Sequence, residues 1–156
     1  MDHASFLEYA ADLALKNVQS GQGGPFGAVV VKNGAIIAEG VNSVTRLGDP
    51  TAHAEVMAIR AACATLGTYQ LIGMTLYSSC EPCPMCLGAI YWARPEALYF
   101  AADKDDASAV GFDDSFIYQE IGHPLKKRAL PTRQIHVPGE LSAFEAWHIA
   151  AKKTAY

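Results

Sequence analysis

Apolar residues recur at helical spacing through the first twenty residues of the chain. An apolar side chain at every third or fourth position forms one face of a helix, and a run such as Gly23-Gly24-Pro25 ends it. The residues of this face are Phe6, Ala10, Leu13, Ala14 and Val18. The pattern predicts a helix that packs this face against a core.

Two short runs rich in valine, isoleucine and alanine follow, at residues 26–32 and 35–41, and Asn33-Gly34 joins them. An Asn-Gly pair between such runs is the strongest local signal for a hairpin, so we expect antiparallel neighbours. Phe26 and Asn42 then come out at the same edge of the sheet, where both could flank one pocket. Their ordinary roles, a core aromatic and a strand-end turn residue, explain the two positions equally well.

Helical and β-rich patterns alternate after this hairpin, which is typical of crossover connections in a parallel sheet. The expected elements are a helix over 52–65, a strand over 74–79, a helix over 82–92 and a strand over 97–101. Further elements expected are a short helix over 105–111, a short strand over 133–137 and a last helix opened by a capping box at Ser142 and Glu145. No internal repeat or linker interrupts the pattern, so residues 1–156 are expected to form a single α/β domain.

The composition narrows the class of protein. With 51% hydrophobic and 18% charged residues, the chain can bury one sizeable core, which excludes extended disorder as its main state. The net charge is 12 − 16 = −4, so a nucleic-acid partner is disfavoured. Charges interrupt the apolar residues near the N-terminus, and no apolar stretch reaches the roughly eighteen residues of a membrane span. We therefore expect a cytoplasmic protein without a membrane segment.

Three of the four cysteines, Cys80, Cys83 and Cys86, fall within seven residues, which favours a metal or redox site over a disulfide framework. Imidazole and thiolate together suit zinc, and three protein ligands leave one tetrahedral position for water. We expect His53, Cys83 and Cys86 to be these ligands, because Cys83 and Cys86 share one face of a helical turn. The metal should lie off the ends of two helices, whose positive N-termini favour thiolates.

Glu55, two residues after His53, is the candidate general acid and base. Zinc lowers the pKa of a bound water to about 7, and a carboxylate that does not bind the metal can carry the water proton to a substrate. His-x-Glu followed by Pro-Cys-x-x-Cys is typical of zinc-dependent deaminases. Two alternatives remain: a closed zinc knuckle with Cys80 as fourth ligand, and a redox Cys-x-x-Cys pair. The first leaves Glu55 without a role, and the second explains neither Glu55 nor His53.

Other chemically active side chains have ordinary interpretations. Cys63 is expected to be a small core residue, and Asp113-Asp114 a solvated turn. The remaining histidines lack a partner pattern and are expected to lie at the surface or to be satisfied locally. They are His3, His123, His136 and His148.

Over essentially its whole length the chain resembles the cytidine deaminase superfamily. The resemblance rests on Gly-Gly-Pro-Phe-Gly-Ala-Val at 23–29, Asn42, Asp-Pro-Thr-Ala-His-Ala-Glu at 49–55 and Ser-Cys-Glu-Pro-Cys-Pro-Met-Cys at 79–86. It implies a three-layer α/β/α fold with a mixed central sheet, and one zinc per chain held by His53, Cys83 and Cys86. It also implies that Asn42 hydrogen-bonds a nucleobase and that Phe26 forms part of the pocket wall.

Within the superfamily, residues 87–94, residues 111–118 and the final Tyr156 are most similar to bacterial guanine deaminases. This similarity implies hydrolysis of guanine to xanthine and ammonia, with Glu55 and Asp114 as catalytic residues and with Ala54 and Tyr156 among the substrate contacts. It further implies a homodimer that exchanges its C-terminal segments, so that Tyr156 of one chain lies over the pocket of the other.

Three other functions compete with this hypothesis. The tRNA adenosine deaminases share the zinc motifs, but only Lys152 and Lys153 are basic after Arg133, whereas a polyanion usually needs more. Cytosine deaminases share the zinc site and a covered pocket. A catalytically silent zinc scaffold is the third alternative, and an intact Glu55 argues against it.

Overall fold

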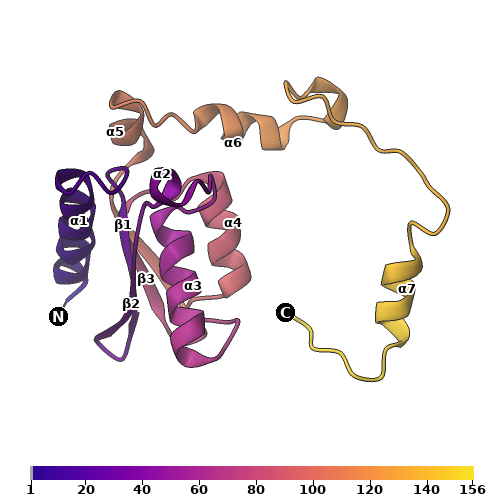
Figure 1. Ribbon diagram of the computed structural model, residues 1–156, viewed down its shortest axis with the longest axis horizontal. Coiled ribbons are helices and arrows are strands. Elements are labelled where there is room, and N and C mark those ends of the chain that lie inside the picture. Colours follow the sequence, from indigo (N-terminus) through magenta and orange to yellow (C-terminus); the bar gives the residue numbers. More distant parts are fainter. Residues whose placement is uncertain (1) are drawn as a thin grey trace. The chain divides into compact units, whose positions relative to one another are not determined.

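The computed structural model describes residues 2–156 (Figure 1). The chain divides into two units, the first ending at Ser115 and the second spanning Phe116–Tyr156. Each unit is described by itself. The expectation of a single domain over 1–156 therefore stays a prediction.

A four-stranded mixed sheet forms the centre of the first unit. Its strands are β1 (Gly27–Lys32), β2 (Ala35–Val41), β3 (Thr75–Cys80) and β4 (Ala97–Ala102), in the order β2-β1-β3-β4. β1 is antiparallel to both of its neighbours, while β3 and β4 are parallel. The expected mixed sheet is confirmed. The strands joined by the helical crossovers, β2, β3 and β4, run in the same direction as expected, and β1 lies antiparallel between β2 and β3.

The predicted hairpin is confirmed. β1 and β2 pair with Lys32 opposite Ala35, and Asn33 and Gly34 form the turn with φ values of 51° and 76°. Asparagine and glycine tolerate these positive φ values, which match the turn to the twist of the strands. The pairing carries Phe26 and Asn42 to the same edge, where the Asn42 N–H donates to the Phe26 carbonyl at 3.1 Å.

Helices cover both faces of the sheet, which confirms the three-layer architecture (Figure 1). α1 (His3–Gln19) lies on one face, and α3 (Ala54–Leu66) and α4 (Pro84–Ala93) lie on the other. β1 is buried on both faces, because alternate side chains join different cores. Ala28 and Val30 join the core beneath α3 and α4, whereas Val29 and Val31 join Phe6 of α1. Two short helices, α2 (Val44–Leu47) and α5 (Lys104–Ala109), complete the first unit.

The buried face of α1 differs from the prediction in its last turn. Val18 is 48% exposed, while Asn17 beside it is only 5% exposed. Asn17 is buried because its side-chain amide finds two backbone carbonyl partners, so a polar residue takes the place that hydrophobic periodicity assigned to valine.

The second unit contains α6 (Ser115–Gly122), a 3-10 turn (Leu125–Lys127) and α7 (Ser142–Ile149). The strand expected over 133–137 is not formed, because no described strand pairs with these residues. The predicted capping box is also wrong: Leu141 is the N-cap of α7, and Ser142 is already helical. None of the residues in 116–156 is buried. Among the described residues, no helix combines the length and apolar character needed to cross a bilayer.

Candidate metal and substrate site

Two helix N-termini carry the predicted ligands. His53 is the N-cap residue of α3, and Cys83 is the N-cap residue of α4, both with extended backbone. Pro84 occupies the first turn of α4, where its missing N–H costs nothing, and Cys86 follows in the same turn. Gly40 of β2 lets α3 approach closely, since a Cβ there would lie 2.1 Å from the Ala54 carbonyl. The sheet and two capped helices thus fix the directions of the ligands.

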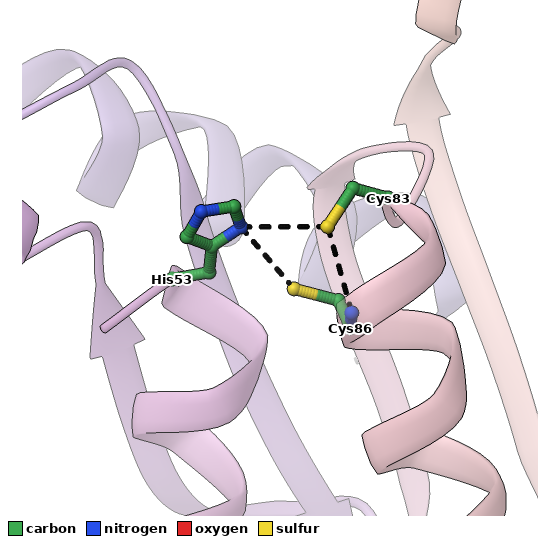
Figure 2. Close-up of side chains that lie close together, drawn as sticks. All are labelled: His53, Cys83 and Cys86. Carbon is green, nitrogen blue, oxygen red and sulfur yellow. Dashed lines mark hydrogen bonds between the residues drawn. The ribbon is translucent and has the colours of Figure 1, made fainter. Parts of the chain in front are cut away.

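The three predicted ligands meet in one cluster (Figure 2). The Nδ1 atom of His53 lies 3.5 Å from the Cys83 sulfur and 3.4 Å from the Cys86 sulfur. All three ligand atoms lie within 4.8 Å of one another. A tetrahedral zinc with bonds of about 2.0 to 2.3 Å holds its ligand atoms roughly 3.5 to 3.8 Å apart. The donor set and its spacing therefore fit one zinc ion.

Cys80 lies outside this cluster. Its thiol contacts the Asp103 carbonyl at 3.5 Å, and burial raises its pKa to about 11. Among the described residues, the group that could hold a metal comprises His53, Cys83 and Cys86 without Cys80. This arrangement favours a site with an open position over the closed knuckle.

Hydrogen bonds within the cluster shift the pKa values of all three ligands. The Cys86 thiol, and after it His53, hydrogen-bonds the Cys83 sulfur and lowers the pKa of Cys83 to about 4. The same bond, together with burial, raises the pKa of Cys86. The pKa of His53 is raised chiefly by its hydrogen bond to Cys83. These hydrogen bonds favour the thiolate form of Cys83, which is the form of cysteine that binds a metal.

Glu55 stands beside the ligands without belonging to them. It lies in the first turn of α3, is 6% exposed and accepts a hydrogen bond from Ser78 Oγ at 3.3 Å. Burial raises the pKa of Glu55, because its charged form loses hydration. A raised pKa makes a carboxyl a better proton acceptor, as a general base requires. No sequence motif points to Ser78, because its hydrogen bond to Glu55 forms only when β3 packs beneath α3.

The side chain of Asn42 is held in one orientation at the end of β2. Its Oδ1 accepts from the N–H groups of Gly24 and Val44, at 3.4 Å and 3.3 Å. A flipped amide would turn its own donor toward these two donors, so Nδ2 is the group left to meet a ligand. Asn42 is 7% exposed and therefore offers this N–H in a largely desolvated setting.

Phe26 and the segment after α5 lie together. The Phe26 ring meets Phe112 edge-on, with ring centroids 5.0 Å apart and planes at 88°. Asp113 is exposed, as expected, and accepts from the Ser115 N–H at 2.9 Å. Asp114 is half-buried, and its pKa is raised by burial and then by the negative charge on Cys83. The Asp114 carboxylate is therefore within electrostatic reach of the ligand cluster.

The remaining predicted positions are placed as follows. Ala54 is fully buried in the core beneath α3, so its methyl group contributes packing. Tyr156 belongs to the second unit and is 69% exposed. Cys63 packs against the core, as expected. The contact of Phe112 with Phe26 was not predicted. The only sequence signal for it was the similarity of residues 111–118 to bacterial guanine deaminases.

The protein belongs to a family of zinc-binding deaminases. Residues 1–102 match the family described as the cytidine and deoxycytidylate deaminase zinc-binding region, which spans most of the chain. The match includes every residue of the ligand cluster as well as Glu55 and Asn42. The expected family and its zinc cofactor are thereby confirmed.

Similar proteins extend the comparison to the whole chain. Guanine deaminase from Bacillus subtilis (strain 168) is 59% identical over 156 residues, which is 100% of both chains. Its crystal structure superposes with a TM-score of 0.98 and covers 100% of this chain and 99% of its own. The protein NE0047, in a crystal structure with bound 2,6-diaminopurine, is 37% identical to this chain. The two superpose with a TM-score of 0.69 over 72% of this chain and 63% of NE0047. The tRNA-specific adenosine deaminase of Aquifex aeolicus (strain VF5) is 38% identical over 83% of this chain and 85% of its own.

Proposed function

We propose that the protein hydrolyses guanine to xanthine and ammonia. The observation that carries the proposal is the three-ligand cluster beside Glu55, a buried carboxyl that is not one of the ligands. Full-length identity of 59% to a guanine deaminase supports guanine as the base. A tRNA adenosine deaminase is a more distant relative at 38% identity.

His53, Cys83 and Cys86 hold the zinc in this proposal. Bound there, zinc supplies an acidified water as the nucleophile at neutral pH. Glu55 accepts the proton of this water and delivers it to the ring nitrogen next to the carbon that bears the amino group. The water oxygen would bond to that carbon, and Glu55 would then move the second proton from this oxygen to the amine. The bond between the carbon and the amine breaks as the new carbonyl group of xanthine forms. One water enters, one ammonia leaves and Glu55 returns to its starting state, so atoms and protons balance.

The neighbouring side chains recognise the base. Asn42 Nδ2 donates to an acceptor on the purine, since Oδ1 already accepts two backbone N–H groups. Asp114 accepts from the ring N–H beside the attacked carbon and from the amino group. Cytosine lacks an N–H next to its reacting carbon, so Asp114 favours guanine. The rings of Phe26 and Phe112 form an apolar wall, and the backbone of Ala54 supplies a further contact.

A second copy of the chain completes the enzyme in this proposal, as a homodimer with exchanged C-terminal segments. Many large apolar side chains of the second unit are exposed, among them Ile135 at 78%, Phe144 at 73% and Ile149 at 81%. Apolar surface on this scale is usually covered by a partner. Tyr156 of one chain then closes the pocket of the other and excludes water from the reacting ring.

We also propose that the enzyme works in the cytoplasm and takes a free base rather than a nucleic acid. Its four cysteines are free, and the thiolate ligands stay competent for zinc in a reducing compartment. A net charge of −4 provides no excess positive field for a polynucleotide.

A panel of substrates tests the proposed reaction. Zinc-loaded protein is mixed with guanine, cytosine, adenine, guanosine, cytidine and a tRNA anticodon stem-loop, and ammonia release is followed. Guanine should be turned over fastest, with xanthine as the product. Faster turnover of cytosine or of the stem-loop would reject guanine as the substrate, and the absence of turnover with every compound would favour a silent zinc scaffold.

A further inference from the structure

Asn17 is a buried polar residue that the zinc chemistry does not use. It lies in the last turn of α1, and only 5% of it is exposed. Its Nδ2 donates two hydrogen bonds, one to the Gly24 carbonyl and one to the Asn42 carbonyl, both at 2.9 Å. These acceptors lie in a loop and at a strand end, so one side-chain amide ties three segments together.

The orientation of the Asn17 amide is fixed by its acceptors. Two carbonyl oxygens face Nδ2, and a flipped amide would set oxygen against oxygen. The backbone carbonyl of Asn17 also accepts from the Gln22 N–H at 3.0 Å and from Ser20 Oγ at 3.1 Å. Asn17 therefore holds both the start and the end of the loop that connects α1 to β1.

The contacts of Asn17 continue into the side chain of Asn42. Gly24 is held twice, because its carbonyl accepts from Asn17 while its N–H donates to Asn42 Oδ1 at 3.4 Å. The packing is close at Gly23, where a Cβ would lie 2.1 Å from the Asn42 carbonyl and 3.0 Å from Asn17 Nδ2. Asn17 thus holds the backbone of Asn42 directly. It also holds the side-chain amide of Asn42 indirectly, through Gly24.

We propose that Asn17 is a positioning residue that holds the Asn42 amide so that Nδ2 points toward the base. This inference rests on the role of Asn42 in the proposed function. Loss of the Asn17 donor frees the loop and the end of β2, and the Asn42 amide then samples orientations in which Oδ1 faces the base. A purine acceptor is repelled by Oδ1, so substrate binding suffers while the zinc ligands keep their places.

The test is a double-mutant cycle with Asn17→Asp and Asn42→Ala, measured as kcat and KM for guanine in the zinc-loaded full-length protein. Aspartate has the shape of asparagine but, when ionised, cannot donate to the two carbonyls. Asn17→Asp alone should raise KM more than it lowers kcat and reduce kcat/KM about 5- to 100-fold. With Asn42→Ala already present, the same change should reduce kcat/KM by less than about twofold.

Phe6→Leu is the matched control. Phe6 is also buried on α1, but it packs against Tyr77 with ring centroids 4.9 Å apart and has no described contact with Asn42. It should lower the melting temperature without raising KM. Zinc content and melting temperature are measured for every variant, and Asn17→Leu, which has a similar size and no hydrogen-bond donor, replaces Asn17→Asp if the latter does not fold.

The outcomes separate two failures. An equal loss from the Asn17 change with and without Asn42 overturns the positioning role and leaves the proposed function standing. Full guanine turnover by Asn42→Ala removes the recognition role itself, and this inference with it. A KM increase in Phe6→Leu as large as that in Asn17→Asp would show that general destabilisation of α1 is the cause.

Discussion

The two units contain similar apolar residues, but only the first unit buries them. In the first unit, Val29, Val30 and Leu76 are fully buried, and the zinc ligands lie at the N-termini of α3 and α4. In the second unit no residue is buried, although Ile135, Phe144 and Ile149 are as apolar as any in the core. A functional site needs rigid support, and the first unit supplies it within a single chain. The second unit contains apolar residues of the kind that form cores, but these residues are not packed into one.

A pair of truncations in the two units tests this difference in packing. Leu76→Ala should lower the free energy of unfolding by about 2 to 5 kcal/mol, because it leaves a cavity between α3 and the sheet. Phe144→Ala should change it by less than about 0.5 kcal/mol in a dilute monomer. Urea unfolding at low protein concentration measures both values, and equal losses would contradict the contrast. At high concentration, Phe144→Ala should weaken self-association in sedimentation experiments.

Zinc affinity should fall as the pH falls. The steepness of this fall depends on how many ligand protons leave when zinc binds. The raised pKa of Cys86 means that its proton leaves when zinc binds, so affinity drops about tenfold per pH unit in the alkaline range. Below the pKa of His53, which lies above its ordinary 6.5, a second proton must leave and the slope becomes about a hundredfold per unit. Competition with a chelator between pH 6 and pH 9 measures the slope. A flat profile would exclude these groups as ligands.

Asp114→Ala should reduce guanine turnover while zinc content and melting temperature stay unchanged. Losing a buried hydrogen-bond partner costs about 1 to 3 kcal/mol, or roughly 5- to 150-fold in kcat/KM. Asp113→Ala is the matched control, because Asp113 is exposed and hydrogen-bonds the neighbouring Ser115. Equal effects of the two changes would assign Asp114 to the turn rather than to the substrate.

Deletion of Thr154-Ala155-Tyr156 should have the smallest effect, about fivefold in kcat/KM, if Tyr156 closes the pocket of a second copy. Chain ends are usually dispensable, so an unchanged rate is the ordinary expectation. Mixing the truncated chain with Glu55→Gln chains sharpens the test. Exchange of segments predicts partial recovery of activity, because a Glu55→Gln chain then donates an intact tail to a catalytic pocket. A fully active truncated monomer would rule out the exchanged dimer.

The sequence predicted most of the first unit because its signals are local. Asn33-Gly34 specifies the hairpin turn by its φ values, and His53 and Cys83 could be placed at helix ends from the spacing of the motifs. Asn17 was missed because its acceptors, Gly24 and Asn42, come together only in the folded chain.

The failures in the second unit have the same origin. A strand over 133–137 needs a neighbour for its backbone N–H and C=O groups, and the local pattern cannot say whether one is present. The capping box failed by a single position, since α7 begins one residue earlier than Ser142 required. Periodicity identifies an apolar face but leaves open which surface covers it.

Glu55→Gln provides the most direct test of the account. The variant keeps the shape and burial of the side chain but cannot carry the proton, whereas Glu8→Gln on the exposed side of α1 serves as control. Zinc content by elemental analysis and guanine turnover are measured on the same preparations. The account predicts one zinc per chain and a loss of turnover of roughly a hundredfold to ten-thousandfold. Full activity in Glu55→Gln, or loss of the zinc together with the activity, would contradict the assignment of Glu55 as a proton carrier that does not bind the metal.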